Sequence, residues 1–88
     1  MTAIKKMYQV LEQMIESADR EDKERVLTLN KLYEGLIPRV YHKPLTPLDL
    51  EYDNCRQSCV MSLQMRNMRE RLLSDAKERF SRIPKPNR

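Results

Sequence analysis

The chain is divided at residues 35–47, GLIPRVYHKPLTP, a stretch that contains its single glycine and three of its five prolines. Gly35 suits the position just after the last residue of a helix, and Pro38 prevents the helix from resuming. We therefore expect a first helix to end at about Glu34. The connection that follows, residues 36–45, is unusually apolar for a loop, so we expect it to pack over the helix ends.

A second helix is predicted to begin directly after this connection. Thr46 suits the N-cap, Pro47 the first helical position and Asp49 the third, where a carboxylate faces free backbone N–H groups. Neither glycine nor proline occurs between Pro47 and Pro84. The pattern therefore predicts a helix over about residues 47–82.

The part of the chain before residue 35 carries apolar residues spaced as on one face of a helix. They are Ile4, Met7, Tyr8, Leu11, Met14, Ile15 and Ala18, followed by Val26, Leu29, Leu32, Tyr33 and Leu36. The charged residues 19–25 between the two groups do not shift the phase of the stripe and include no glycine or proline. One helix over about residues 3–34 is our first prediction. In the alternative, the helix breaks near Asp19–Asp22, with Asp19 as the N-cap and Asp22 at N3 of a further helix.

The predicted fold is all-α. Two long helices, about 3–34 and 47–82, form an antiparallel helical hairpin that is completed by dimerisation or by a partner. A break in the first helix would instead give a three-helix bundle. Residues 1–83 form one helical domain, and residues 84–88 form a short basic tail. A single glycine among 88 residues argues against β-sandwich and dinucleotide-binding folds, which need glycines for turns and phosphate loops.

The second predicted helix carries two apolar stripes, and this determines the expected function. The first stripe can face the first helix of the hairpin. The second needs another body and is therefore our predicted partner-binding surface; it consists of Met61, Met65, Met68, Leu72 and Ala76. The alternative, in which these residues are ordinary core against a third helix, is equally open. The expected partner is a second copy of the chain, giving a homodimer, or a larger protein complex.

The two cysteines, Cys55 and Cys59, lie one helical turn apart and are interpreted as buried, reduced, small apolar residues. A metal site formed by Cys55, Cys59 and His42 is a weaker alternative, because zinc needs four ligands and these supply three. We expect no metal and no other cofactor.

Two charged residues lie on the apolar stripes, Asp22 on the first helix and Arg66 on the second. In an antiparallel hairpin that turns near residue 41, Arg66 can reach back toward Asp22, and the pair would fix the register of the helices. The alternative, in which both side chains reach solvent at the edge of the stripe, remains open.

The function expected from these features is that of a non-enzymatic protein–protein interaction module: an adaptor, a small complex subunit, an assembly factor or an inhibitor. No nucleophile motif, paired-carboxylate motif or glycine loop indicates catalysis. The net charge of +4 and the basic residues after residue 54 support an alternative, a nucleic-acid-associated helical protein. Those residues are spread around the helix, however, without the regular interleaving of aromatic residues that base stacking uses. No apolar run approaches the roughly 20 residues of a membrane span, and no signal peptide is apparent. Together with two cysteines, this predicts the cytoplasm or another reducing compartment.

Overall fold

The computed structural model describes residues 2–41 and 43–86, and it is all-α as predicted. Both long helices, however, are broken. The helices of the described residues are α1 (Ala3–Asp19), α2 (Lys23–Val40), α3 (Pro47–Gln64) and α4 (Arg69–Arg82), with a 3-10 turn, η1 (Arg66–Met68), before the last of them. The prediction of a two-helix hairpin is therefore wrong. The alternative break near residues 19–22 is present, but a second break makes the total four helices rather than three.

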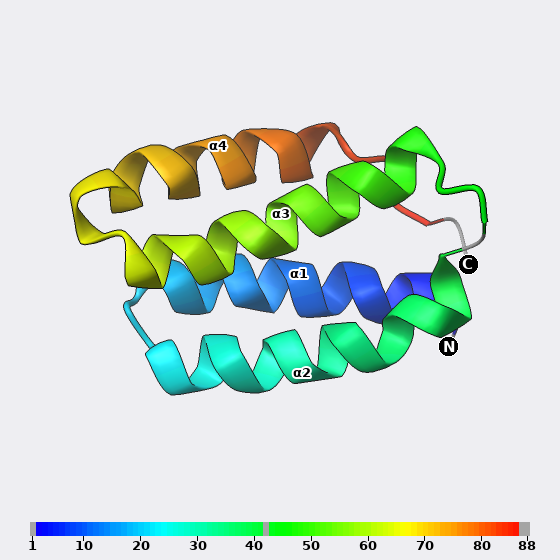
Figure 1. Ribbon diagram of the computed structural model, residues 1–88, viewed down its shortest axis with the longest axis horizontal. Coiled ribbons are helices and arrows are strands. Elements are labelled where there is room, and N and C mark those ends of the chain that lie inside the picture. Colours follow the sequence, from blue (N-terminus) through cyan, green and yellow to red (C-terminus); the bar gives the residue numbers. More distant parts are fainter. Residues whose placement is uncertain (1, 42, 87–88) are drawn as a thin grey trace.

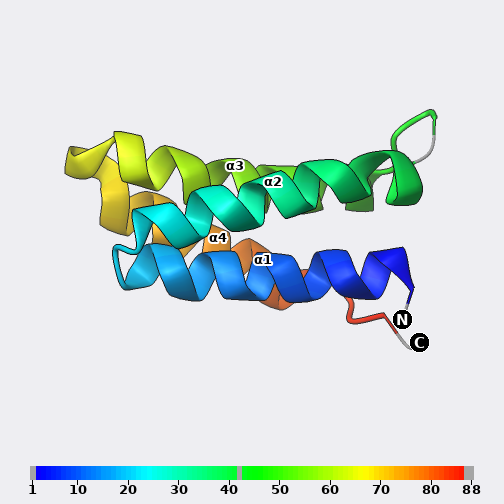
Figure 2. The same ribbon diagram turned by 90° about the horizontal axis from the view of Figure 1, so that it is seen from below.

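The four helices form two antiparallel hairpins, α1–α2 and α3–α4, packed against each other (Figure 1). Helices α1 and α3 each contact all three of the others, whereas α2 and α4, within the described residues, do not contact each other. Both hairpin turns lie at one end, and the α2–α3 connection lies at the opposite end (Figures 1 and 2). The molecule measures 35 × 22 × 22 Å.

The first break is a Schellman motif at the end of α1. The backbone N–H of Asp22 donates to the carbonyl of Ser17 (2.9 Å), and that of Glu21 donates to the carbonyl of Ala18 (3.0 Å). Glu21 has a φ of 61°, in the left-handed region. Asp22 then caps α2, because its Oδ1 accepts from the backbone N–H of Arg25 at 3.2 Å. The predicted cap at Asp19 is thus wrong by three residues, since Asp19 is the last residue of α1.

The second break, at residues 65–68, was not predicted. Helix α3 ends at Gln64, and Met65 leaves the helical region with φ −113° and ψ 74°. No glycine or proline causes the break. Its physical reason is tertiary: α4 folds back along α1 and α3, and this buries Leu73, Ala76 and Ile83. Helix packing therefore buries within one chain the C-terminal part of the apolar strip that a two-helix hairpin would leave to a partner, and leaves Met61, Met65 and Met68 exposed.

The end of α2 also differs from the prediction. The helix does not end at Glu34 but continues through Gly35 and Pro38 to Val40. Proline lacks an N–H, so the carbonyl of Glu34 loses its helical donor near an exposed helix end, where the loss is small. The predicted start of α3 is confirmed. Thr46 Oγ1 accepts from the N–H of Asp49 (3.1 Å), and Asp49 Oδ2 accepts from the N–H of Thr46 (2.9 Å), forming a capping box.

The core is formed by the predicted stripe of the first two helices together with α3 and α4. Its fully buried large side chains are Met7, Leu11, Met14, Val26, Tyr33, Tyr52, Cys55 and Cys59. An aromatic cluster joins the two hairpins. The ring of Tyr8 lies edge-on to Tyr52, with centroids 6.5 Å apart, and 4.7 Å from Phe80. None of the helices in the described chain is both long and apolar enough to cross a bilayer.

Candidate partner-binding surface

The predicted partner-binding residues do not form one surface, because the second break divides them. Met61 lies in the last turn of α3, Met65 is the C-cap of that helix, and Met68 ends η1. These three are exposed, at 41%, 38% and 39% respectively, and we call them the methionine surface. Leu72 is half-buried, and Ala76 is fully buried in the core. The N-terminal part of the predicted strip is thus available to a partner, and the C-terminal part is not.

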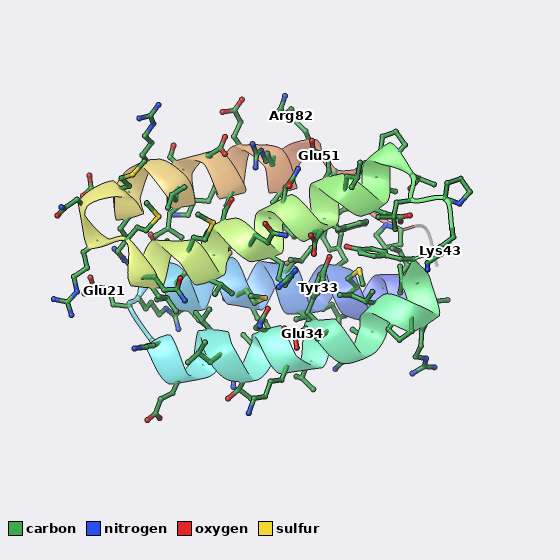
Figure 3. All side chains as sticks on the ribbon, viewed as in Figure 1. Glu21, Tyr33, Glu34, Lys43, Glu51 and Arg82 are labelled. Atoms are coloured by element: carbon green, nitrogen blue, oxygen red, sulfur yellow. The ribbon has the colours of Figure 1, made fainter. Side chains whose placement is uncertain are left out.

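Three shallow hollows lie around this surface, and Arg66 lines all of them. The first, of about 450 Å³, is lined by Gln64, Met65, Arg66, Asn67 and Met68. The second, of about 460 Å³, reaches the α1–α2 turn and is lined by Glu21, Lys23, Ser62, Leu63, Arg66 and Arg69. The third, of about 420 Å³, is lined by Glu21, Arg66, Asn67, Arg69, Glu70 and Arg71. Figure 3 shows Glu21 at this end of the bundle.

Arg69, the first residue of α4, fastens the two hairpins together beside this surface. Its Nη2 donates to the carbonyls of Ala18 and Asp19 at the end of α1, and its Nη1 lies 3.6 Å from a carboxylate oxygen of Glu21. Lys77 adds an ion pair with Asp19 at 3.1 Å. A cation is favourable here because the last carbonyls of a helix carry partial negative charge.

The predicted register pair is not formed as an ion pair. Asp22 caps α2 instead, and Arg66 is exposed and takes part in none of the ion pairs among the described residues. The contact that joins this part of the two hairpins is the one between Arg69 and the end of α1. Sequence reasoning missed it because Arg69 meets α1 only once the break at residues 65–68 turns α4 back.

The cysteines are free and fully buried. Cys55 Sγ lies 3.8 Å from the carbonyl oxygen of Ala76 across the α3–α4 interface. Burial raises the pKa of Cys55 to about 11 and that of Cys59 to about 12, so both stay protonated at neutral pH. His42 lies outside the described residues. Across residues 2–41 and 43–86, no histidine, cysteine and carboxylate side chains gather in a group of three that could hold a metal ion.

At the opposite end, the α2–α3 connection forms a further hollow of about 430 Å³, which is largely apolar. It is lined by Ile37, Pro38, Tyr41, Lys43, Leu45, Asp49, Leu50 and Asp53. The prediction that this connection packs over the helix ends holds in part. Val40 is buried and Tyr41 half-buried, while Leu45 remains 51% exposed. Figure 3 shows Lys43 at this end of the bundle.

A partly buried polar network lies beside that hollow and was also missed from the sequence. The hydroxyl groups of Tyr33 and Tyr41 are hydrogen-bonded to each other, and the guanidinium of Arg56 lies 5.5 Å from the centre of the Tyr33 ring. Arg56 is held in turn by Asp53 at 2.6 Å and by Asn30 at 3.3 Å. Burial raises the pKa of Tyr33 and of Tyr41 well above the usual range of a phenol. These phenols therefore remain neutral hydrogen-bonding groups between α2 and α3.

The chain was compared with models of known protein families, with curated proteins and with solved structures, and no significant match was found in any of the three comparisons.

Proposed function

We propose that this chain is a small, non-enzymatic protein–protein interaction module, and that the methionine surface is where it binds its partner. The observation that carries the proposal is the exposure of Met61, Met65 and Met68 in successive turns around the α3–α4 junction. Methionine side chains are flexible and polarizable, so such a surface adapts to the shape of a partner. The partner is a second copy of the chain or a larger complex, in which this chain is an adaptor, a subunit, an assembly factor or an inhibitor.

The energy available from the methionines sets a lower limit on the size of the interface. Burying a whole methionine contributes about 1.5–3 kcal/mol, so covering the exposed two-fifths of three of them contributes roughly 2–4 kcal/mol. A micromolar complex needs about 8 kcal/mol net of the cost of association. The methionines can therefore anchor a complex, but neighbouring polar groups must contribute as well.

A non-enzymatic role is supported by how the reactive groups are used. The thiols of Cys55 and Cys59 are buried and protonated, and the hydroxyls of Tyr33 and Tyr41 are bonded to each other. Free thiols also accord with the proposed location in the cytoplasm or another reducing compartment. These groups serve packing rather than chemistry at a surface.

The nucleic-acid alternative has less support, because most of the late basic residues are already paired. Five of them form ion pairs with carboxylates of the same chain: Arg56, Arg69, Lys77, Arg79 and Arg82. A binder of phosphate backbones needs cations that are free to replace counterions along one face.

The test is the mass of the protein in solution, alone and in an extract of its own cells. We expect the wild type to sediment above the monomer mass in at least one of these conditions. Met65→Glu should return it to the monomer mass with unchanged helix content, because charge in a desolvated contact is costly whereas Met65 is exposed in the isolated chain. The control is Leu32→Glu, which places the same charge at another exposed apolar position and should behave as the wild type. A monomeric wild type in both conditions, or an assembly that survives Met65→Glu, would contradict the proposal.

A further inference from the structure

Most cations of the α3–α4 hairpin form ion pairs with carboxylates of the chain, and a minority do not. Seven of them lie on α3, η1 and α4, and five of these make ion pairs within the chain. Within the described residues, the two that make none are Arg66 and Arg71. Both lie at the end of the bundle that carries the methionine surface. Within the hairpin of α3 and α4, the two cations without a described ion pair therefore lie at the same end as the exposed methionines.

Arg66 shares a hollow with two of the methionines, and the neighbouring hollows bring in further cations. Arg66 lies between Met65 and Met68 in sequence and lines all three hollows, while Arg71 lines the third hollow and Lys23 the second. Four cationic and two anionic side chains line the three hollows in total. One of the two acids, Glu21, already faces Arg69 at 3.6 Å. The first hollow thus combines two exposed methionines with Arg66, and the two hollows that share Arg66 with it add Lys23 and Arg71.

We propose that this surface binds an acidic amphipathic helix of a partner protein, with the apolar face of that helix on the methionines and its carboxylates toward Arg66, Arg71 and Lys23. This inference rests on the proposed function. An amphipathic helix presents its apolar residues at i, i+3/i+4 and i+7 along one face, and that face can cover the exposed methionines. Exposed guanidinium groups pair with carboxylates in bidentate geometry and set the choice of partner.

A nucleic acid fits the same surface less well. The residues that line the three hollows include no aromatic side chain on which a base could stack. The exposed methionines would also gain nothing from a phosphate backbone. An oligonucleotide is therefore the comparison arm of the test rather than the proposed ligand.

The test uses designed helical peptides as probes and the full chain with its methionine methyl groups labelled with carbon-13. One peptide has leucines in a single helical stripe flanked by glutamates. A second has the same stripe flanked by lysines, and a third has the acidic composition in scrambled order. A single-stranded oligonucleotide of the same net charge is the fourth probe. Binding is measured by calorimetry at two salt concentrations and by the methyl signals of Met61, Met65 and Met68.

We expect the acidic amphipathic peptide to bind tightest, to shift those three methyl signals and to lose affinity as salt is raised. Arg66→Glu should weaken this binding about tenfold or more, because it places like charges opposite each other. The matched control is Arg82→Glu, a charge reversal at a side chain that is 68% exposed and lies at the other end of α4. It should leave the affinity unchanged.

The failures are distinguishable. Equal binding of the lysine-flanked peptide would overturn the acidic assignment and leave the interaction function standing. Equal binding of the scrambled peptide or of the oligonucleotide would show a surface for polyanions and would overturn the proposal of an amphipathic helix. Binding of none of the probes would also overturn it, whereas the interaction function itself is decided by the mass of wild type and Met65→Glu.

Discussion

The two hairpin turns lie at the same end of the molecule, yet they are constructed in opposite ways. The turn at residues 20–22 is closed: a Schellman motif satisfies the end of α1, Asp22 caps α2, and Arg69 and Lys77 bind it from α4. The turn at residues 65–68 has no side-chain cap among the described residues, exposes two methionines and carries Arg66, which makes no ion pair with them. The first turn is held by several contacts with α4, and the second leaves apolar side chains exposed.

The largest expected effect on stability is at Ala76, the buried end of the predicted partner-binding strip. Ala76→Glu should destabilise the protein by about 3–5 kcal/mol, because it buries a charge without a partner at a fully buried site beside Cys55. Met65→Glu, at the turn itself, should change the free energy of unfolding by less than about 0.5 kcal/mol. Urea denaturation followed by circular dichroism measures both. Equal effects would mean that the two halves of the strip have the same environment.

A rise in pH should lower the free energy of unfolding, because both buried cysteines lie in the core. The pKa values of Cys55 and Cys59 are raised by burial to about 11 and about 12, whereas an unfolded thiol titrates near about 8.5. The unfolded chain thus releases these protons first, so stability is full below about pH 8.5 and falls as pH rises toward the folded values. Each thiol should account for about 1.4 kcal/mol per pH unit, or roughly 2–3 kcal/mol for both between pH 9 and 10. Denaturation at several pH values measures this, and a double Cys55→Ala, Cys59→Ala variant should show a smaller decline.

The contact of Arg69 with the end of α1 should contribute to the stability of the fold. Arg69→Ala should destabilise the protein by about 1–2 kcal/mol, since carbonyls at the end of α1 lose a charged donor. Arg66→Ala, three residues away and exposed, is the matched control and should cost less than about 0.5 kcal/mol. If the two variants are equally stable, Arg69 does not hold the hairpins together and the contrast between the turns is lost.

The smallest expected effect is a gain in stability. Glu21 has a φ of 61°, which costs a residue with a side chain roughly 1–2 kcal/mol, whereas glycine adopts it freely at an entropic cost of about 0.5–1 kcal/mol. Glu21→Gly should therefore stabilise the protein by about 0.5 kcal/mol, since the exposed ion pair with Arg69 contributes little. Glu12→Gly, on an exposed position within α1, should instead destabilise by about 1 kcal/mol. Thermal unfolding of the two variants compares them.

A structural feature could be predicted from the sequence where it is caused by residues close together in the chain. The cap at Thr46 and Asp49 depends on four consecutive residues and was predicted correctly. So was most of the apolar face of the first two helices, although Leu32 of that face is 49% exposed. The first break was foreseen only as an alternative, because its left-handed residue is Glu21 rather than glycine. The break at residues 65–68 has no local signal at all.

In the candidate site, too, features with a local cause could be predicted and features that depend on helix packing could not. The exposure of Met61, Met65 and Met68 accords with the predicted surface, whereas burial of Ala76 depends on where α4 turns back. The roles of Arg69 and Arg56 could not be predicted either. Arg69 joins α4 to α1, Arg56 joins α3 to Asn30 and the Tyr33 ring of α2, and the sequence pattern does not specify how these helices pack. What could be predicted were the apolar positions; which of them stay exposed is decided by the breaks.

The exposure of the methionine surface is tested most directly by the solvent accessibility of the individual methionine methyl groups in the isolated chain. A soluble paramagnetic reagent broadens the carbon-13 methyl signals that it can approach, at a concentration where sedimentation shows a monomer. We expect strong broadening for Met61, Met65 and Met68, and little for Met7 and Met14, which are fully buried in α1. Protection of Met65 and Met68 to the level of Met7 would contradict this expectation, because the α3–α4 turn would then be part of the core rather than a surface open to a partner.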